Sequence, residues 1–157
     1  MRCFHCHNAE LRQVEEEVQL EVDLKGGAQP FSVSGVPATR CSSCGESFMA
    51  AADLQRAELQ VGAELADRGI REGAAFRFMR KALGLRAVDL AGLLDVTAET
   101  VSHWENDHTA ADSGAWAALA AMISDRLAGK TTTIDRLRAT KEPRRTSGPV
   151  QLRLAHG

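Results

Sequence analysis

Four cysteines form two closely spaced pairs near the N-terminus. One pair is Cys3 and Cys6, within "CFHC", and the other is Cys41 and Cys44, within "CSSC". Two C-x-x-C steps brought together supply four thiolates, enough to close the tetrahedral ligand shell of Zn²⁺. Because four sulfur ligands leave no position for water, such a site is structural and not catalytic. The spacing therefore predicts one structural zinc ion per chain.

Other chemistry for these cysteines agrees less well with the sequence. A thioredoxin-like redox C-x-x-C needs a βαβ context and would explain only one pair. Structural disulfides require an oxidising compartment. His5 and His7 lie beside the first pair and could replace a sulfur ligand, but a complete thiolate set favours a bystander role. We see no carboxylate–histidine arrangement for catalysis, and we therefore expect that the protein is not an enzyme.

The residues between the two pairs predict a β-hairpin that brings the pairs together. Residues 18–24 ("VQLEVDL") alternate apolar and polar side chains, which is the period of a half-buried strand. Residues 25–27 are a turn signal, and a second strand is expected from Phe31. The outer face of the first strand is either a solvated face or a surface for a basic partner. Its members are Glu17, Gln19, Glu21 and Asp23.

Charge is distributed unevenly along the 157 residues, which suit one ordinary domain or two small ones. Residues 1–68 hold 6 basic and 11 acidic side chains (net −5), residues 69–128 hold 6 and 8 (−2), and residues 129–157 hold 7 and 2 (+5). Three parts with different partners are therefore expected. No apolar run reaches the ~18 residues that span a bilayer, and the N-terminus lacks an apolar signal core. We expect a cytoplasmic protein without membrane contact.

Residues 49–128 have the period and the breaks of a helical bundle. Residues 49–68 are good helix formers with apolar side chains at Leu54, Val61 and Leu65, and we expect them to link two domains. A further helix is expected from about residue 72 to Gly84, which is placed as a C-terminal cap. A final helix carries an apolar stripe. Its members are Trp116, Leu119, Ala120, Ile123 and Leu127.

Residues 83–105 ("LGLRAVDLAGLLDVTAETVSHWE") have the order of a helix-turn-helix. A short helix with Leu90, Ala91 and Leu94 on its inner face precedes a turn at Asp95, and Thr97 caps a second helix. This order indicates a DNA-reading pair of helices, and a bundle without DNA function is the alternative. Val101 and Trp104 of the second helix are expected to point inward. Its outer face consists of Ala98, Glu99, Thr100, Ser102 and His103.

The two glutamates of that second helix are expected to have different roles. Glu105 follows Trp104 near the helix end, where it can turn into the domain and form a structural ion pair with Arg80. Glu99 lies on the first exposed turn, the part of a recognition helix nearest the base edges. A carboxylate there can accept a hydrogen bond from cytosine N4. We therefore predict that Glu99 is a specificity residue.

Positive charge for the phosphate backbone has to come from other positions. The basic residues that precede the second helix are Arg71, Arg77, Arg80, Lys81 and Arg86. Arg86 stands near a helix start, a natural phosphate-binding point, and the Thr97 hydroxyl could bind a phosphate instead of capping its helix. The residues expected at DNA are Arg86, Thr97, Ala98, Glu99, Thr100, Ser102, His103 and Asn106.

The chain resembles the MqsA/YgiT-type antitoxins of type II toxin–antitoxin systems, in which an N-terminal zinc domain with four cysteine ligands precedes an Xre/Cro-type helix-turn-helix. The resemblance covers residues 1–128 and rests on "MRCFHC", "GVPATRCSSCGE" and the helix-turn-helix stretch. It implies that the four cysteines bind zinc and that the N-terminal domain binds a toxin, often a basic ribonuclease. It also implies a homodimer that represses its own promoter at a palindromic operator, with Ala98, Glu99, Thr100 and His103 facing the major groove.

The chain departs from that family pattern at three positions. Ala87 stands where glutamine is common, and Asp107 and His108 replace a loop that often carries lysine. Fewer phosphate contacts are therefore expected there. The stretch after residue 128 has no counterpart in the resemblance. It is expected to be mostly flexible, and it either attracts DNA non-specifically or is a solvated extension.

The predicted protein is mainly α with a small β zinc-binding domain. Its parts are a zinc- and toxin-binding domain (1–48), a linker helix (49–68), a helix-turn-helix DNA-binding and dimerisation domain (69–128) and a basic flexible tail (129–157). The predicted function is that of an antitoxin that autoregulates its operon and neutralises a toxin. The alternative is a stand-alone zinc-containing regulator without a toxin partner.

Overall fold

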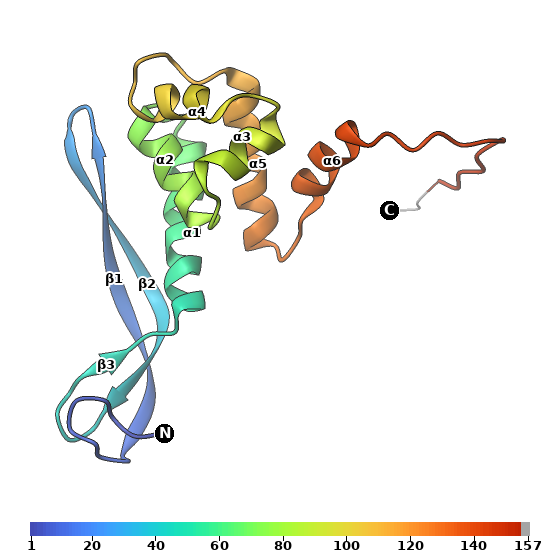
Figure 1. Ribbon diagram of the computed structural model, residues 1–157. Coiled ribbons are helices and arrows are strands. Elements are labelled where there is room, and N and C mark those ends of the chain that lie inside the picture. Colours follow the sequence, from blue (N-terminus) through green and yellow to red (C-terminus); the bar gives the residue numbers. More distant parts are fainter. Residues whose placement is uncertain (155–157) are drawn as a thin grey trace.

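A long β-hairpin lies beside a bundle of helices in the computed structural model, which describes residues 1–154 (Figure 1). The elements are β1 (Leu11–Leu24), β2 (Gly27–Cys41), β3 (Ser47–Phe48), α1 (Ala51–Asp67), α2 (Gly73–Ala82), α3 (Ala87–Leu94), α4 (Ala98–Glu105), α5 (Ser113–Leu127) and α6 (Thr132–Lys141). The predicted fold class, mainly α with a small β module at the N-terminus, is confirmed. Within these residues no helix has both the length and the apolar character needed to cross a bilayer.

The hairpin is longer than the alternation of residues 18–24 indicated, because β1 and β2 pair along their whole length. One irregularity interrupts the pairing. Two residues separate Val33 from Val36 on β2, whereas one residue separates their partners Val18 and Glu16 on β1. Gly35 supplies the left-handed conformation (φ +75°) that this bulge uses. The extra residue keeps the apolar side chains on one face although their spacing along β2 changes.

Helices α1 to α5 surround one apolar core, and the aromatic rings of three helices meet in it. Phe76 is fully buried, with its ring 5.6 Å from the ring of Trp104 and 6.2 Å from that of Trp116. Other side chains without exposed area include Met79, Leu90, Leu119 and Ile123. The apolar stripe predicted for the last helix of the bundle therefore faces the core.

Helix α1 belongs to this core, although it was expected to be a linker between two domains. Leu59, Val61 and Leu65 are at most 4% exposed and lie in the same apolar cluster as Val22 of β1. Leu54, which was expected on the apolar face, is 38% exposed. A 17-residue helix with one apolar face has to bury that face, and here α2, α5 and the hairpin cover it. The hairpin and the helices consequently share a single core.

Part of the C-terminal stretch is ordered, which the sequence did not indicate. Residues 132–141 form α6, with Ile134 9% exposed and Leu137 packed against the core. The backbone N–H of Thr133 donates to Asp125 Oδ2 (2.6 Å), which attaches the start of α6 to α5. Two apolar side chains among many charged ones are too few to produce a helical period. The expectation of a flexible tail from residue 129 was therefore wrong for this helix, and residues 142–154 have no helix or strand.

Candidate metal centre and nucleic-acid interface

The four cysteines converge at the end of the hairpin that lies farthest from α4 (Figure 1). Their sulfur atoms all lie within 4.8 Å of one another. The Sγ atoms of Cys3 and Cys44 are 3.6 Å apart, and those of Cys6 and Cys41 are 3.5 Å apart. Zn–S bonds of about 2.3 Å in a tetrahedron place the sulfurs about 3.8 Å apart. The cluster therefore has the size and the donor set of a tetrahedral thiolate site, and it contains neither His5 nor His7.

A tight turn carries each cysteine pair. The N–H of His7 donates to the carbonyl of Cys3 (2.9 Å), and the N–H of Gly45 donates to the carbonyl of Cys41 (3.0 Å). Both His7 (φ 60°) and Gly45 (φ +76°) adopt the left-handed conformation that closes such a turn. His7 is thus a turn residue whose backbone, and not its imidazole, shapes the site.

Hydrogen bonds from the backbone favour the thiolate form of one cysteine. The N–H groups of Cys44 and Ser43 lower the pKa of the Cys41 thiol to about 6. At Cys44 the N–H of Glu46 acts in the same direction, but burial and the neighbouring thiols outweigh it and raise the pKa to about 12. Four thiolates this close repel one another without a cation. A divalent metal ion removes that repulsion, so the arrangement suits a soft, tetrahedral cation such as Zn²⁺.

A polar network fixes the second cysteine turn to the hairpin. Arg40 Nη2 donates to Glu16 Oε1 (2.7 Å), Arg40 Nε donates to Ser47 Oγ (3.1 Å), and the Ser47 hydroxyl donates to the same carboxylate. The Ser47 hydroxyl and then Arg40 hold the pKa of Glu16 below its usual range. These contacts join β1, β2 and β3 beside the four cysteines.

Helices α3 and α4 form the predicted helix-turn-helix at the opposite end of the molecule (Figure 1). Asp95 ends α3 in a left-handed conformation (φ 59°), and the Thr97 hydroxyl caps α4 by accepting from the N–H of Thr100 (3.1 Å). Val101 and Trp104 are buried. The remaining face of α4 is open to a ligand, with Ala98, Glu99 and Ser102 exposed and Thr100 and His103 half-buried.

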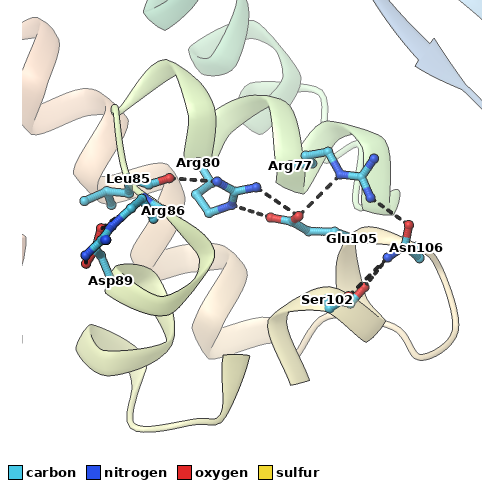
Figure 2. A network of polar contacts seen from close by, with 8 residues as sticks. All are labelled: Arg77, Arg80, Leu85, Arg86, Asp89, Ser102, Glu105 and Asn106. Atoms are coloured by element: carbon cyan, nitrogen blue, oxygen red, sulfur yellow. Dashed lines mark hydrogen bonds and ion pairs between the residues drawn. The ribbon is translucent and has the colours of Figure 1, made fainter. Parts of the chain in front are cut away.

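Glu105 lies inside the domain, paired with two arginines of α2 (Figure 2). Arg80 Nε and Nη2 lie 2.5 Å and 3.0 Å from the two carboxylate oxygens, and Arg80 Nη1 donates to the Leu85 carbonyl (2.7 Å). Arg77 Nε lies 3.3 Å from Glu105 Oε2. Glu105 is 8% exposed and Arg80 9%. The expected ion pair is present, and its second arginine was not foreseen.

Other polar residues expected at DNA are engaged within the chain. Asn106 Oδ1 accepts from Arg77 Nη2 (2.7 Å) while Asn106 Nδ2 donates to the Ser102 carbonyl (2.8 Å), which ends α4 (Figure 2). Arg86 donates to both carboxylate oxygens of Asp89 at 2.8 Å. Four of the five basic residues that precede the second helix of the pair thus have partners in the chain. They are Arg71, which donates to the Ala111 carbonyl (2.6 Å), Arg77, Arg80 and Arg86.

Glu99 stands apart from these networks on the first turn of α4. Its side chain is 80% exposed, and Glu99 Oε1 lies 3.8 Å from Nε2 of His103. The His103 ring in turn lies 5.4 Å from the ring of His108. The carboxylate is therefore exposed at the place where a recognition helix meets base edges.

Asp107 joins three segments, a role that sequence reasoning missed. Its Oδ1 atom accepts from the N–H of Gly73 at the start of α2 (3.0 Å) and lies 3.3 Å from Lys25 Nζ in the hairpin turn. The N–H of Lys25 also donates to Glu72 Oε2 (2.5 Å). The hairpin turn is consequently attached both to the loop that follows α4 and to the start of α2. Because the three segments are far apart in the chain, no local pattern could have revealed the contact.

Comparison with known protein families gives a match for the helical region. Residues 76–123 match the family model described as Helix-turn-helix, a match that runs from α2 through α5 and covers less than a third of the chain. A comparison with curated proteins found no match. The fold and the family match together define an Xre-type helix-turn-helix domain, the class of domain that DNA-binding transcription regulators use.

Proposed function

We propose that the protein is a sequence-specific transcriptional repressor that acts as the antitoxin of a type II toxin–antitoxin pair. As a homodimer it binds a palindromic operator in its own promoter, and through its N-terminal region it neutralises a toxin. The observation that carries the proposal is the open face of α4 within a matched helix-turn-helix domain, together with a four-cysteine cluster at the other end of the molecule.

In this proposal the metal is one structural zinc ion per chain, held by Cys3, Cys6, Cys41 and Cys44. The sulfur separations of 3.5 and 3.6 Å and the burial of Cys3 and Cys41 support it. Zinc bound by four thiolates holds the two cysteine turns together and has no position left for a substrate. The ion thus shapes the N-terminal region and performs no reaction.

The proposed DNA contacts divide between base edges and phosphates. Ala98, Glu99, Thr100 and His103 lie toward the major groove, with Glu99 accepting from cytosine N4. The hydroxyls of Thr97 and Ser102 lie at the groove edge. The guanidinium of Arg86 already donates to Asp89, and Asn106 Nδ2, the atom that could donate to a phosphate, already donates to the Ser102 carbonyl. We therefore expect their share of the binding free energy to be small.

The proposed toxin surface is the acidic outer face of β1. Glu17, Gln19, Glu21 and Asp23 are all exposed, as the alternation of the sequence indicated, and none of them lies on the face that packs against the helices. A row of carboxylates at the spacing of a strand is complementary to a basic protein surface. This complementarity supports a basic toxin.

Two measurements test the proposal. Zinc-loaded protein is titrated at low ionic strength against its own upstream DNA and against a scrambled duplex of equal length, and a preference for the upstream DNA is expected. Glu99→Ala should change the preference at one position of each half-site, whereas Glu58→Ala on α1 should leave it unchanged. Equal affinity for both duplexes would contradict sequence-specific repression.

Co-expression with the product of the neighbouring gene tests the antitoxin role. We expect that product to co-purify, and to be released by the triple variant Glu17→Gln/Glu21→Gln/Asp23→Asn. A second candidate, a stand-alone regulator without a toxin, is favoured by the packing of Val22 into the helical core and by the contact of Lys25 with Asp107. Operator binding without any co-purifying partner would select it.

A further inference from the structure

The surface that α3 and α4 present is short of free positive charge. Asp89, Asp95 and Glu99 contribute carboxylates there, and the guanidinium of Arg86 is bound to Asp89. Arg77 and Arg80 are held by Glu105 behind α4. Since attraction to phosphates supplies most non-specific DNA affinity, a DNA-binding protein with this surface needs basic groups from another segment.

Helix α6 brings such a segment to the helix-turn-helix. Ile134 is buried, and the bond from the Thr133 N–H to Asp125 fixes the start of the helix. At its other end Lys141 Nζ donates to the carbonyl of Gly92 in α3 and lies 3.9 Å from Asp95 Oδ1. The direction of α6 is thus set at both ends, and its C-terminus lies against α3.

The chain leaves α6 beside the turn that leads into the recognition helix. Asp95 stands two residues before Thr97, the N-cap of α4. In helix-turn-helix complexes the N-terminal residues of the recognition helix contact base edges in the major groove, so phosphates flank that point on both sides. Because Lys141 contacts Gly92 and Asp95, the segment that begins at residue 142 starts next to the expected position of a phosphate strand.

Residues 142–154 have the charge and the exposure of an arm. They carry Arg144, Arg145 and Arg153 against one acidic residue, Glu142, and all of them are exposed. Thirteen residues at about 3.3 Å each reach up to roughly 43 Å, which exceeds one turn of B-DNA, about 34 Å. Such a segment can follow the backbone beyond the groove that α4 occupies.

We propose that residues 142–154 form a basic arm that contacts the phosphates of duplex DNA flanking the site read by α4. The inference rests on the proposed DNA binding and adds a second, sequence-independent contact surface to it. The arginines of the arm supply the positive charge that α3 and α4 lack, and α6 places the start of the arm beside α3. Because the contacts are to phosphates, they raise affinity for every sequence and do not alter operator preference.

The experiment measures the salt dependence of binding by the full-length protein and by Arg144→Ala/Arg145→Ala. The matched control is Arg12→Ala/Arg56→Ala, which removes two exposed arginines elsewhere on the molecule. Arg144→Lys/Arg145→Lys keeps the charge. The probes are a duplex of the upstream DNA and a scrambled duplex of equal length, titrated by fluorescence anisotropy from about 50 to 200 mM salt, with circular dichroism to verify folding.

A plot of log K against log salt has a negative slope, and each lost phosphate contact should reduce the magnitude of that slope by about 0.9. The arm variant is expected to lose a slope of about 2 on both duplexes, so that the advantage of the wild type shrinks roughly tenfold across this salt range. The lysine variant and the control should keep the wild-type slope. An unchanged slope in the arm variant, or an equal loss in the control, would overturn the inference.

The same data separate this inference from the proposed function. If the wild type binds both duplexes equally but the arm variant still loses slope, the arm contacts DNA and sequence-specific repression is wrong. If the upstream DNA is preferred and the arm variant has the wild-type slope, repression stands and the arm does not touch DNA.

Discussion

The two ends of the molecule are held together by different forces. At the helix-turn-helix end Phe76, Leu90 and Ile123 have no exposed area, so burial of apolar surface accounts for most of its stability. At the cysteine end the buried side chains are small (Cys3, Val36, Ala38 and Cys41), whereas Phe4 is 76% exposed and touches only the ring of Phe48 among the aromatic residues described. Such a small module has little core of its own, so we expect a metal ion held by the four cysteines to supply most of its stability.

The cysteine end should therefore be sensitive to loss of a metal ion, and the helical end to changes in the packing of its core. Loss of the metal should release the cysteine turns but leave the helices folded. A void or a clash in the helical core should lower its melting temperature but leave the affinity for zinc unchanged. The packing of Val22 and the contact between Lys25 and Asp107 connect the hairpin with the helices. These contacts are the boundary between the two regions.

Metal removal should produce the largest effect. Structural zinc sites contribute on the order of 10 kcal/mol to folding, so a chelator should expose residues 1–17 and 34–48 to amide exchange while the helical circular dichroism persists. Cys41→Ala should have the same result without a chelator, whereas Ser42→Ala should not. Purified protein without stoichiometric zinc, under reducing conditions, would contradict the comparison.

The buried ion pair should give the next largest effect. Glu105→Ala leaves Arg80 and Arg77 without their carboxylate, and removing one partner of a buried pair costs about 3–5 kcal/mol. Glu64→Ala removes the carboxylate of an exposed pair with Arg68 on α1, which should cost less than about 1 kcal/mol. Denaturant titration of both variants checks this ranking, and equal costs would show that the pair is not essential to the core.

A close approach of two helices should respond to a single methyl group. A Cβ atom at Gly73 would lie 2.5 Å from the Trp104 carbonyl oxygen and 2.7 Å from that of Glu105. Gly73→Ala should therefore cost about 1–3 kcal/mol, since backbone atoms have to move. Gly92→Ala in α3 meets no atom within 4 Å and should stabilise the protein by about 0.5–1 kcal/mol. Thermal melts that change in the same direction for both variants would refute this packing.

The smallest effect should come from the exposed pair at the start of α3, and it should depend on pH. Hydrogen bonds from Arg86 lower the pKa of Asp89, so the carboxylate stabilises the folded state above the ordinary pKa of aspartate, about 3.9. That contribution disappears as the pH falls through the lowered pKa. Metal-free Asp89→Asn should therefore melt slightly below the wild type at neutral pH, and the two should converge as the pH falls below the ordinary aspartate range. If the difference in melting temperature between the two proteins persists in acid, the Arg86–Asp89 pair is not its cause.

Local patterns were sufficient for most of the fold and for much of the candidate sites. The C-x-x-C spacing predicted the thiolate cluster because a tight turn of four residues necessarily directs both sulfurs to one side. The i, i+3 spacing of Val101 and Trp104 predicted which face of α4 is buried, and Thr97 predicted where that helix begins. The inward orientation of Glu105 was predicted from its place directly after Trp104, near the end of the helix.

Most of the elements, the cluster of four cysteines and the exposed face of α4 could thus be predicted from the amino-acid sequence, since each depends on neighbours within a few residues. Three features became visible only in the folded chain: α1 lies in a core shared with the hairpin, Asp107 joins Lys25 to Gly73, and α6 brings its basic extension to α3. These contacts join residues far apart in the chain, as Lys25 and Asp107 are, and burial and charge pairing through space leave no period in the sequence.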